Sequence, residues 1–244
     1  MSSKVALITG GAKGIGRGVA LDLATRGWSV AICYRTSARE ADKVIDGVKQ
    51  TGNAGLALQC DVSNCQAAVE LVERVHQEFG RVDALINGAG PYHRVSLLQE
   101  TNAGWHGMFD NNLHPVFYLT QAVVPIMKIQ KWGRIVSFSM ANAEQLIAQP
   151  QLTAHYITKV GLLALSRSFA KLIASDGITM NCVSPGFIDS GSAPKEELDR
   201  MVKMIPAGYV GSVDDAVAAV RYLLSDEARY VNGANIQLSG AWGV

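Results

Sequence analysis

The chain has 244 residues, 48% of them hydrophobic, with 22 Lys and Arg against 21 Asp and Glu for a formal net charge of +1. This length and composition predict one large α/β core in a single domain, residues 1–244, and the balanced, scattered charge argues against a nucleic-acid partner. The chain opens without a secretory leader and has no run of 18 apolar residues, so we expect a cytoplasmic protein without membrane contact.

Seven short apolar runs alternate with longer amphipathic stretches. Near-continuous apolar strands separated by helix-length segments indicate a parallel sheet covered on both faces. We therefore predict a doubly wound α/β fold of about seven strands, with no repeat or linker to divide it. The predicted strands are KVALIT (4–9), WSVAICY (28–34), GLALQCDV (55–62), RVDALING (81–88), GRIVSFS (133–139), GITMNCVS (177–184) and ANIQL (234–238).

A glycine-rich turn, TGGAKGIG, directly follows the first strand and leads into a helix-forming stretch. Glycines at such a turn let backbone N–H groups approach a pyrophosphate, and the helix N-terminus adds a favourable partial charge. Plain loop chemistry also produces glycine-rich turns, but the strand–turn–helix context favours dinucleotide binding. The predicted contact residues here are Gly10, Lys13, Gly14, Ile15 and Gly16.

The second strand ends at Tyr34-Arg35-Thr36, without the acidic residue that would bond a ribose 2′-hydroxyl. Arg35, beside Thr36, and Lys13 in the glycine-rich turn offer two cations suited to a 2′-phosphate. The alternative is that both are solvated surface charges. This pattern predicts NADP(H) as the cofactor in preference to NAD(H).

Later strand ends carry further polar and small residues. Asp61 and Val62 follow the third strand and suit an adenine, and NGAG follows the fourth, where Asn87, Ala89 and Gly90 leave room for a ribose. Each stretch alone is equally typical of a turn. Because the carboxyl ends of parallel strands meet at one edge, together they predict a single crevice.

The four cysteines, at 33, 60, 65 and 182, form no C-x-x-C pair and lie beside no histidine at zinc-ligand spacing. We expect reduced, mostly buried thiols and no metal. The polar stretch from Asp189 to Lys203 follows a strand end through SPG, which makes it a candidate mobile lid.

TGGAKGIG, NGAG, NNLHPVF, SPGFIDS and LSDEARYVNGANIQLSG occur in the order found in short-chain dehydrogenases/reductases. From Lys4 to Gly240 the chain resembles this family, especially its 3-oxoacyl-[acyl-carrier-protein] reductase-like members. The resemblance implies a Rossmann-type domain that moves hydride between a nicotinamide and a carbonyl or related carbon of a small-molecule or acyl-thioester substrate. It also implies a homotetramer, and the apolar stretch VGLLALSRSFAKLIA exceeds what one buried helix face needs.

Several roles follow from the resemblance position by position. Asn112 matches the asparagine that holds a proton-relay water, and Lys159 matches the lysine that binds the nicotinamide ribose and lowers the pKa of the acid. The alternative interpretation, without a functional role, is that Asn112 is an amide bonded to backbone inside a helix and Lys159 is an ordinary solvated lysine. SPGFIDS matches the loop that meets the carboxamide, through Ile188 and through Ser190, where threonine is usual. The predicted contacts of this loop are Pro185, Gly186, Ile188 and Ser190.

The active-site motif departs from the family pattern. The position of the catalytic serine holds Met140, whose thioether donates no hydrogen bond, and Ser139 lies one residue early. Aligned on Lys159, the position of the catalytic tyrosine holds His155, and Tyr156 follows it. On a helix His155 lies about 40° to one side of Lys159 and Tyr156 about 60° to the other, so both reach the same face.

Three interpretations of AHYITK stay open: a shifted helix start lets Tyr156 act as the acid, His155 is the acid, or neither acts. A phenol has pKa ~10 and an imidazole ~6.5. A lysine ammonium and an oxidised nicotinamide pull a phenol toward neutral pH but push an imidazole further below it, which favours Tyr156.

The leading hypothesis is an NADP(H)-dependent carbonyl reductase with Tyr156 as proton donor, assisted by Lys159 and Ser139. The alternatives are reduction of a C=N or conjugated C=C bond, as in an imine or a pterin-like ring, and a cofactor-binding subunit without catalysis. The sequence does not name the substrate. Expected pocket residues are Tyr92, Met140, Gln145, Gln149 and Phe187, and among the other histidines only His93 is expected near the pocket mouth.

Overall fold

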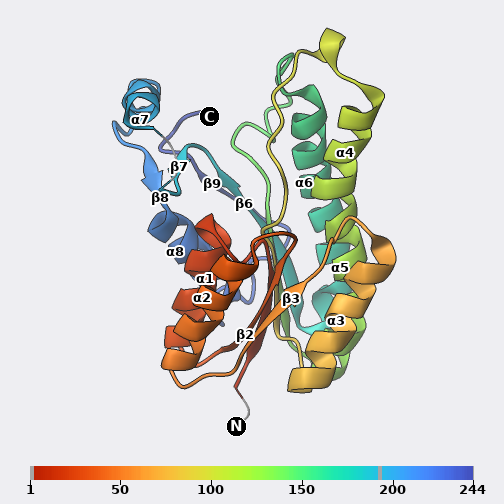
Figure 1. Ribbon diagram of the computed structural model, residues 1–244. Helices are drawn as coiled ribbons and strands as arrows, with labels where there is room; N and C mark the ends of the chain where they lie inside the picture. Colours follow the sequence, from red (N-terminus) through yellow and green to blue (C-terminus); the bar gives the residue numbers. More distant parts are fainter. Residues whose placement is uncertain (1–2, 192–193, 244) are drawn as a thin grey trace.

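The fold is built around a sheet of seven parallel strands, which runs through the centre of the molecule in Figure 1. The computed structural model describes residues 3–191 and 194–243. The strand order is β3-β2-β1-β4-β5-β6-β9, and all six neighbouring pairs are parallel. The strands are β1 (Val5–Thr9), β2 (Ser29–Tyr34), β3 (Gly55–Gln59), β4 (Ala84–Asn87), β5 (Gly133–Phe138), β6 (Ile178–Pro185) and β9 (Asn235–Leu238).

Each strand coincides with one of the seven predicted apolar runs, which confirms the predicted doubly wound α/β fold. The five residues of β1 are all buried, and β2 and β5 each bury five of their six residues. Burial on both faces explains why these strands are continuously apolar and do not alternate.

Two layers of helices cover the sheet (Figure 1). On one face lie α1 (Gly14–Thr25), α2 (Ala38–Gln50) and α8 (Val213–Leu224); on the other lie α3 (Cys65–Phe79), α4 (Asn102–Asn112), α5 (His114–Gln130) and α6 (Thr153–Ile173). Each layer has its own apolar core, one under α1, α2 and α8 and one under α3, α5 and α6. None of the helices in the described part of the chain combines the length and apolarity needed to cross a bilayer.

Short elements complete the chain at the carboxyl end of the sheet. β7 (Ile188–Asp189) pairs with β8 (Gly211–Ser212), and α7 (Lys195–Val202) lies between them in sequence. Two single-turn 3₁₀ helices, η1 (Leu97–Gln99) and η2 (Ala174–Asp176), precede α4 and follow α6. The predicted lid, Asp189 to Lys203, therefore begins at the last residue of β7 and contains α7, while residues 192–193 lie outside the described part; its mobility stays a prediction.

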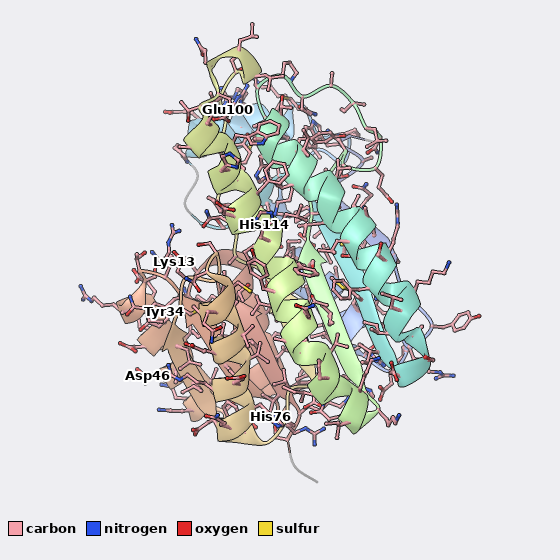
Figure 2. All side chains as sticks on the ribbon, turned by 90° about the vertical axis from the view of Figure 1, so that its right-hand side faces the viewer. Lys13, Tyr34, Asp46, His76, Glu100 and His114 are labelled. Atoms are coloured by element: carbon pink, nitrogen blue, oxygen red, sulfur yellow. The ribbon has the colours of Figure 1, made fainter. Side chains whose placement is uncertain are left out.

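The direction of winding reverses between β1 and β4, which are hydrogen-bonded neighbours. In open α/β sheets a ligand crevice forms at this point, outside the carboxyl ends of the strands. Figure 2 shows Lys13 and Tyr34 toward this end of the sheet and His76 at the opposite end.

Candidate active site

A cavity of about 320 Å³ lies at the carboxyl ends of the central strands. Its walls come from the glycine-rich turn after β1 and from the segments that follow β2, β3 and β4. The topology thus brings together segments that are far apart in sequence. Predicted cofactor residues that line it are Gly10, Lys13, Arg35, Thr36, Asp61, Val62, Ala89 and Gly90.

Two glycines of this crevice stand where any side chain would collide. Gly10 has a positive φ of 66°, and a Cβ there would lie 2.9 Å from the Gly88 carbonyl oxygen. A Cβ on Gly90 would lie 2.5 Å from Asn112 Oδ1 and 3.6 Å from Lys159 Nζ. The crevice is therefore bounded by bare backbone, as close approach of a dinucleotide requires.

The fourth strand end is tied to the first by Thr9. The backbone N–H groups of Gly88 and Ala89 donate to Thr9 Oγ1 at 3.1 and 3.2 Å. Asn87 is buried and its amide donates to Ser137 Oγ at 3.1 Å, so it joins β4 to β5 and does not line the crevice. These bonds fix the floor on which a ribose would lie.

Both predicted cations lie at the crevice, and each has a partner. Lys13 Nζ is 3.6 Å from Glu40 Oε1, in an exposed pair. Arg35 donates to Asn111 Oδ1 at 3.2 Å, and Asn111 also lines the crevice. The sequence analysis missed Asn111, although it directly precedes the predicted Asn112. Asn111 holds the guanidinium of Arg35 toward the cavity without neutralising it.

Asp61, which follows β3, lines the crevice. The Ser63 hydroxyl and N–H both donate to Asp61 Oδ1, at 2.7 and 3.1 Å. These bonds, with the hydroxyl bond first, hold the pKa of the Asp61 carboxyl below its usual range. The carboxylate is thus an ionised acceptor at neutral pH.

The polar ends of the Lys159 and Asn112 side chains both lie close to Gly90. Lys159 is buried, its Nζ donates to the Phe138 carbonyl at 2.9 Å, and burial lowers its pKa to about 8. Asn112 donates to the carbonyls of Pro91 and Met108, while its buried Oδ1 has no partner among the described residues. An orphaned acceptor beside a buried ammonium leaves a place for a donor, such as a water or a ribose hydroxyl.

The remaining predicted cofactor residues lie around the same edge. Ile188 is in β7, and a Cβ built on Gly14 would lie 3.7 Å from Ser190 Cβ, so the loop after β6 reaches the glycine-rich turn. Ile15 packs its side chain against the core under α1. Gly16 faces the Gly10 backbone, and Pro185 and Gly186 line a second cavity.

The second cavity, of about 820 Å³, lies above β6 and the start of α6. Four of the five expected pocket residues line it: Tyr92, Met140, Gln149 and Phe187. Gln145 does not, because its amide donates to the Gly243 carbonyl at 2.8 Å. His93 does not either, and lies 3.1 Å from Glu100. The lining that the sequence analysis missed includes Arg94, Leu152, Glu197, Arg200, Met201, Met204 and Trp242.

The serine position of the motif contributes no hydroxyl to this cavity. Ser139 is buried, and its Oγ donates to the Lys159 backbone carbonyl at 2.8 Å. Met140, which follows, lines the cavity. The geometry therefore gives no support to assistance by Ser139 and favours a site in which the hydrogen bond of a serine is missing.

His155 is the titratable residue of α6 that lines the second cavity. Its ring meets the edge of Tyr92 at 5.3 Å between centroids. Burial and, after it, the Lys159 ammonium lower the pKa of His155 to about 4, against a smaller opposing effect of the Pro91 carbonyl. The imidazole is therefore neutral at physiological pH, and its Nδ1 is buried without a partner among the described residues.

Tyr156 points elsewhere. α6 begins at Thr153, and the Tyr156 N–H donates regularly to the Leu152 carbonyl, so the helix start is not shifted to bring the phenol into the cavity. The Tyr156 hydroxyl donates to the Asn142 carbonyl at 2.8 Å and accepts from the Ile147 N–H at 3.1 Å. Tyr156 lines neither cavity.

Comparison with known proteins gives consistent matches over nearly the full length. Residues 10–241 match the family model described as "Enoyl-(Acyl carrier protein) reductase". The chain is 35% identical over 241 residues to a 3-oxoacyl-[acyl-carrier-protein] reductase of Staphylococcus epidermidis, covering 98% of both chains. It is 32% identical over 248 residues to the protein of that name from Pseudomonas aeruginosa, covering 98% of this chain and 97% of the other.

Two solved structures have the same overall fold. A putative short-chain alcohol dehydrogenase from Sinorhizobium meliloti matches with a TM-score of 0.92 at 27% identity, covering 99% of this chain and 97% of the other. An acetoin dehydrogenase from Salmonella typhimurium matches with a TM-score of 0.90 at 26% identity, covering 98% and 96%.

Proposed function

The chain belongs to the short-chain dehydrogenase/reductase family of oxidoreductases, and from that premise we propose that it reduces the carbonyl group of a ketone or 3-oxoacyl-type substrate with NADPH. One observation carries the proposal. The cofactor crevice and the second cavity adjoin along residues 90–92, since Gly90 and Pro91 line the first and Tyr92 lines the second. A substrate in the second cavity would thus lie against a nicotinamide in the crevice.

The crevice fits a nicotinamide dinucleotide, which when bound supplies the hydride. Glycine backbone would cradle its pyrophosphate, Asp61 would accept from the adenine, and the orphaned Asn112 Oδ1 and the Lys159 ammonium would face a ribose. Arg35 and Lys13 support NADP(H) over NAD(H), because two cations at the end of β2 favour a 2′-phosphate.

Two residues compete for the substrate oxygen. The charge argument favours Tyr156, whereas the position in the cavity supports His155, because of these two rings only that of His155 lines the cavity. The Tyr156 hydroxyl has two backbone partners and the His155 ring has one, the Pro91 carbonyl. We propose that neutral His155 turns its single N–H from the Pro91 carbonyl to the substrate oxygen as negative charge develops there, with the Lys159 ammonium close enough to lower the pKa of His155. Tyr156 as the proton donor stays a prediction that the variants described below test.

The test is turnover by the purified protein. We expect NADPH consumption, followed at 340 nm, with a panel of 3-oxoacyl thioesters and simple ketones, and slower or no consumption with NADH. Failure of every carbonyl together with turnover of imines or conjugated enones would move the activity to the second candidate. No turnover with any substrate, but tight NADPH binding, would support a subunit without catalysis.

The second candidate, reduction of a C=N or conjugated C=C bond, is favoured by one structural observation. Neither Ser139 nor Tyr156 presents its hydroxyl to the cavity, and the imidazole of His155 is neutral. Such bonds need less help from an acid than a carbonyl, which must become an alkoxide. The name of the matching family model, an enoyl reductase, is consistent with this chemistry.

We also propose a homotetramer, in which apolar side chains on the α5 and α6 surfaces meet a partner. Phe117 and Leu172 are 40% and 72% exposed, more than core packing would leave open. Sedimentation at micromolar concentration checks this, and a monomer alone would contradict it.

A further inference from the structure

We infer that Tyr156 is a positioning residue for the substrate cavity: its hydroxyl closes the turn from Asn142 to Ile147 and so holds the segment that walls the cavity. The expected effect on the KM for a carbonyl substrate rests on the proposed function. The expected effect on the turn itself rests on geometry alone. Tyr156 thus has a role in substrate binding that does not require it to transfer a proton.

The hydroxyl joins the two ends of a six-residue turn. It donates to the Asn142 carbonyl at 2.8 Å and accepts from the Ile147 N–H at 3.1 Å. Tyr156 is 6% exposed, so water does not readily replace either bond. Because the ring belongs to the first turn of α6, these bonds anchor the turn to a helix of 21 residues.

The turn needs an anchor because its own backbone is unfavourable. Leu146 has φ 52°, a left-handed value that few residues other than glycine and asparagine adopt, and Asn142, at φ 71°, is of the type that tolerates it. Leu146 and Ile147 are 72% and 45% exposed, so apolar burial holds the far end only weakly. Inside the turn, the Gln145 N–H donates to the Asn142 carbonyl at 3.1 Å.

The middle of the turn has separate attachments. Glu144 accepts from Arg167 on α6 and from Asn235 at the start of β9, and Gln145 donates to the Gly243 carbonyl. None of these reaches Ile147. The Tyr156 hydroxyl is therefore the polar contact that fixes the far end, where the chain turns back toward the cavity.

The same segment forms one wall of the cavity on either side of the turn. Met140 lies two residues before the turn, and residues 149–152 begin two residues after it. His155, which lines the cavity, precedes Tyr156 in the first turn of α6, so the residue that faces the cavity and the residue that bonds the turn are neighbours. The cofactor crevice draws no lining residue from 140–156, so loosening the turn should change the cavity and spare the crevice.

The test is Tyr156→Phe, which keeps the ring and removes the hydroxyl, with Tyr230→Phe as the matched control because Tyr230 is 98% exposed. We expect the KM for the carbonyl substrate to rise about 5- to 30-fold with kcat within about threefold of the parent and NADPH affinity unchanged. Hydrogen exchange of the Ile147 amide should accelerate at least about tenfold, with the amides of α6 unaffected.

Two results would overturn the inference. A fall in kcat of about 10²-fold or more at unchanged KM would make Tyr156 the acid. An Ile147 amide that exchanges at the parental rate, or acceleration spread evenly over the whole chain, would show that the hydroxyl does not hold this turn. If the parent reduces no carbonyl, the proposed function fails, while the exchange experiment still decides the role of Tyr156.

Discussion

The crevice proposed for the cofactor and the second cavity, proposed for the substrate, are built by different means. The ends of four parallel strands and the turns that follow them form most of the crevice, with Gly10 and Gly90 at points where a side chain would collide. Side chains carried by separate loops, by α7, by the start of α6 and by the chain end at Trp242 form the cavity. The sheet fixes the positions of the strand ends, whereas the shape of the second cavity depends on the contacts that hold its loops in place.

This difference separates the effects that substitutions should have. A change in the crevice acts through steric collision or charge on cofactor affinity and on the fold. A change at the start of α6 acts on a single oriented side chain, and therefore on rate, on substrate affinity or on a titration.

The largest effect is expected from His155→Phe, which keeps an aromatic ring against Tyr92 but removes the N–H donor. Loss of one hydrogen-bond donor to a developing oxyanion typically lowers kcat by about 10²- to 10³-fold. We expect such a fall at little changed NADPH affinity, measured by steady-state kinetics and by cofactor titration.

His155→Gln is the matched variant, because its side-chain amide retains an N–H donor of similar reach. It should keep more activity than His155→Phe. Equal and full activity of both variants would remove His155 from the chemistry, and a dead Tyr156→Phe enzyme beside them would return the role to the phenol.

The next effect is a pH dependence of stability. Burial and the Lys159 ammonium lower the pKa of His155 from 6.5 to about 4, so between these values the unfolded chain binds a proton that the native chain does not. The free energy of unfolding should therefore fall as pH falls from about 6.5 toward 4, by roughly 2–3 kcal/mol between pH 7 and 4.5 from this group. Urea unfolding at both pH values measures it.

Carboxyl groups also titrate in this range, so the informative quantity is the difference between the parent and His155→Gln. The variant should lose about 2–3 kcal/mol less than the parent over the same interval. Identical losses in the two proteins would mean that His155 is protonated in the native state or is open to water.

The sequence predicted the sheet and the crevice because both depend on local features. Seven apolar runs specify the strands, and Gly10 and Gly90 stand at strand ends whose position follows from the topology. The start of α6 was harder to predict, because neighbouring residues on a helix differ by about 100° and both His155 and Tyr156 face Lys159 equally well. The two side chains differ in their contacts, because the Tyr156 hydroxyl is hydrogen-bonded to the backbone of the turn at 142–147. Arg94, Arg200 and Trp242 were missed because only the packing of α7 and two loops brings them together.

A glycine pair tests the claim that bare backbone defines the crevice. In Gly10→Ala the new Cβ would meet the Gly88 carbonyl at 2.9 Å at a φ of 66°, so we expect a loss of about 1–3 kcal/mol of stability and weaker NADPH binding. Gly107→Ala in α4 is the control, because its Cβ would meet nothing within 4 Å. It should stabilise the protein by about 0.5–1 kcal/mol. Thermal unfolding and cofactor titration compare the two.

The smallest effect is expected from Arg35→Ser, which tests whether charge at the end of β2 selects the cofactor. The guanidinium lies on the crevice and is held by Asn111 at 3.2 Å, whereas Lys13 shares its charge with Glu40. Arg35 should therefore contribute most of the attraction for a 2′-phosphate. We expect NADPH to bind about tenfold more weakly, a loss of about 1.4 kcal/mol, with NADH unchanged and the difference shrinking at high salt. Lys49→Ser, in the last turn of α2, is the control for net charge and should alter neither affinity. If Arg35→Ser weakens the binding of NADPH and NADH equally, or of neither, the guanidinium does not recognise the 2′-phosphate, and the preference for NADPH loses its structural basis.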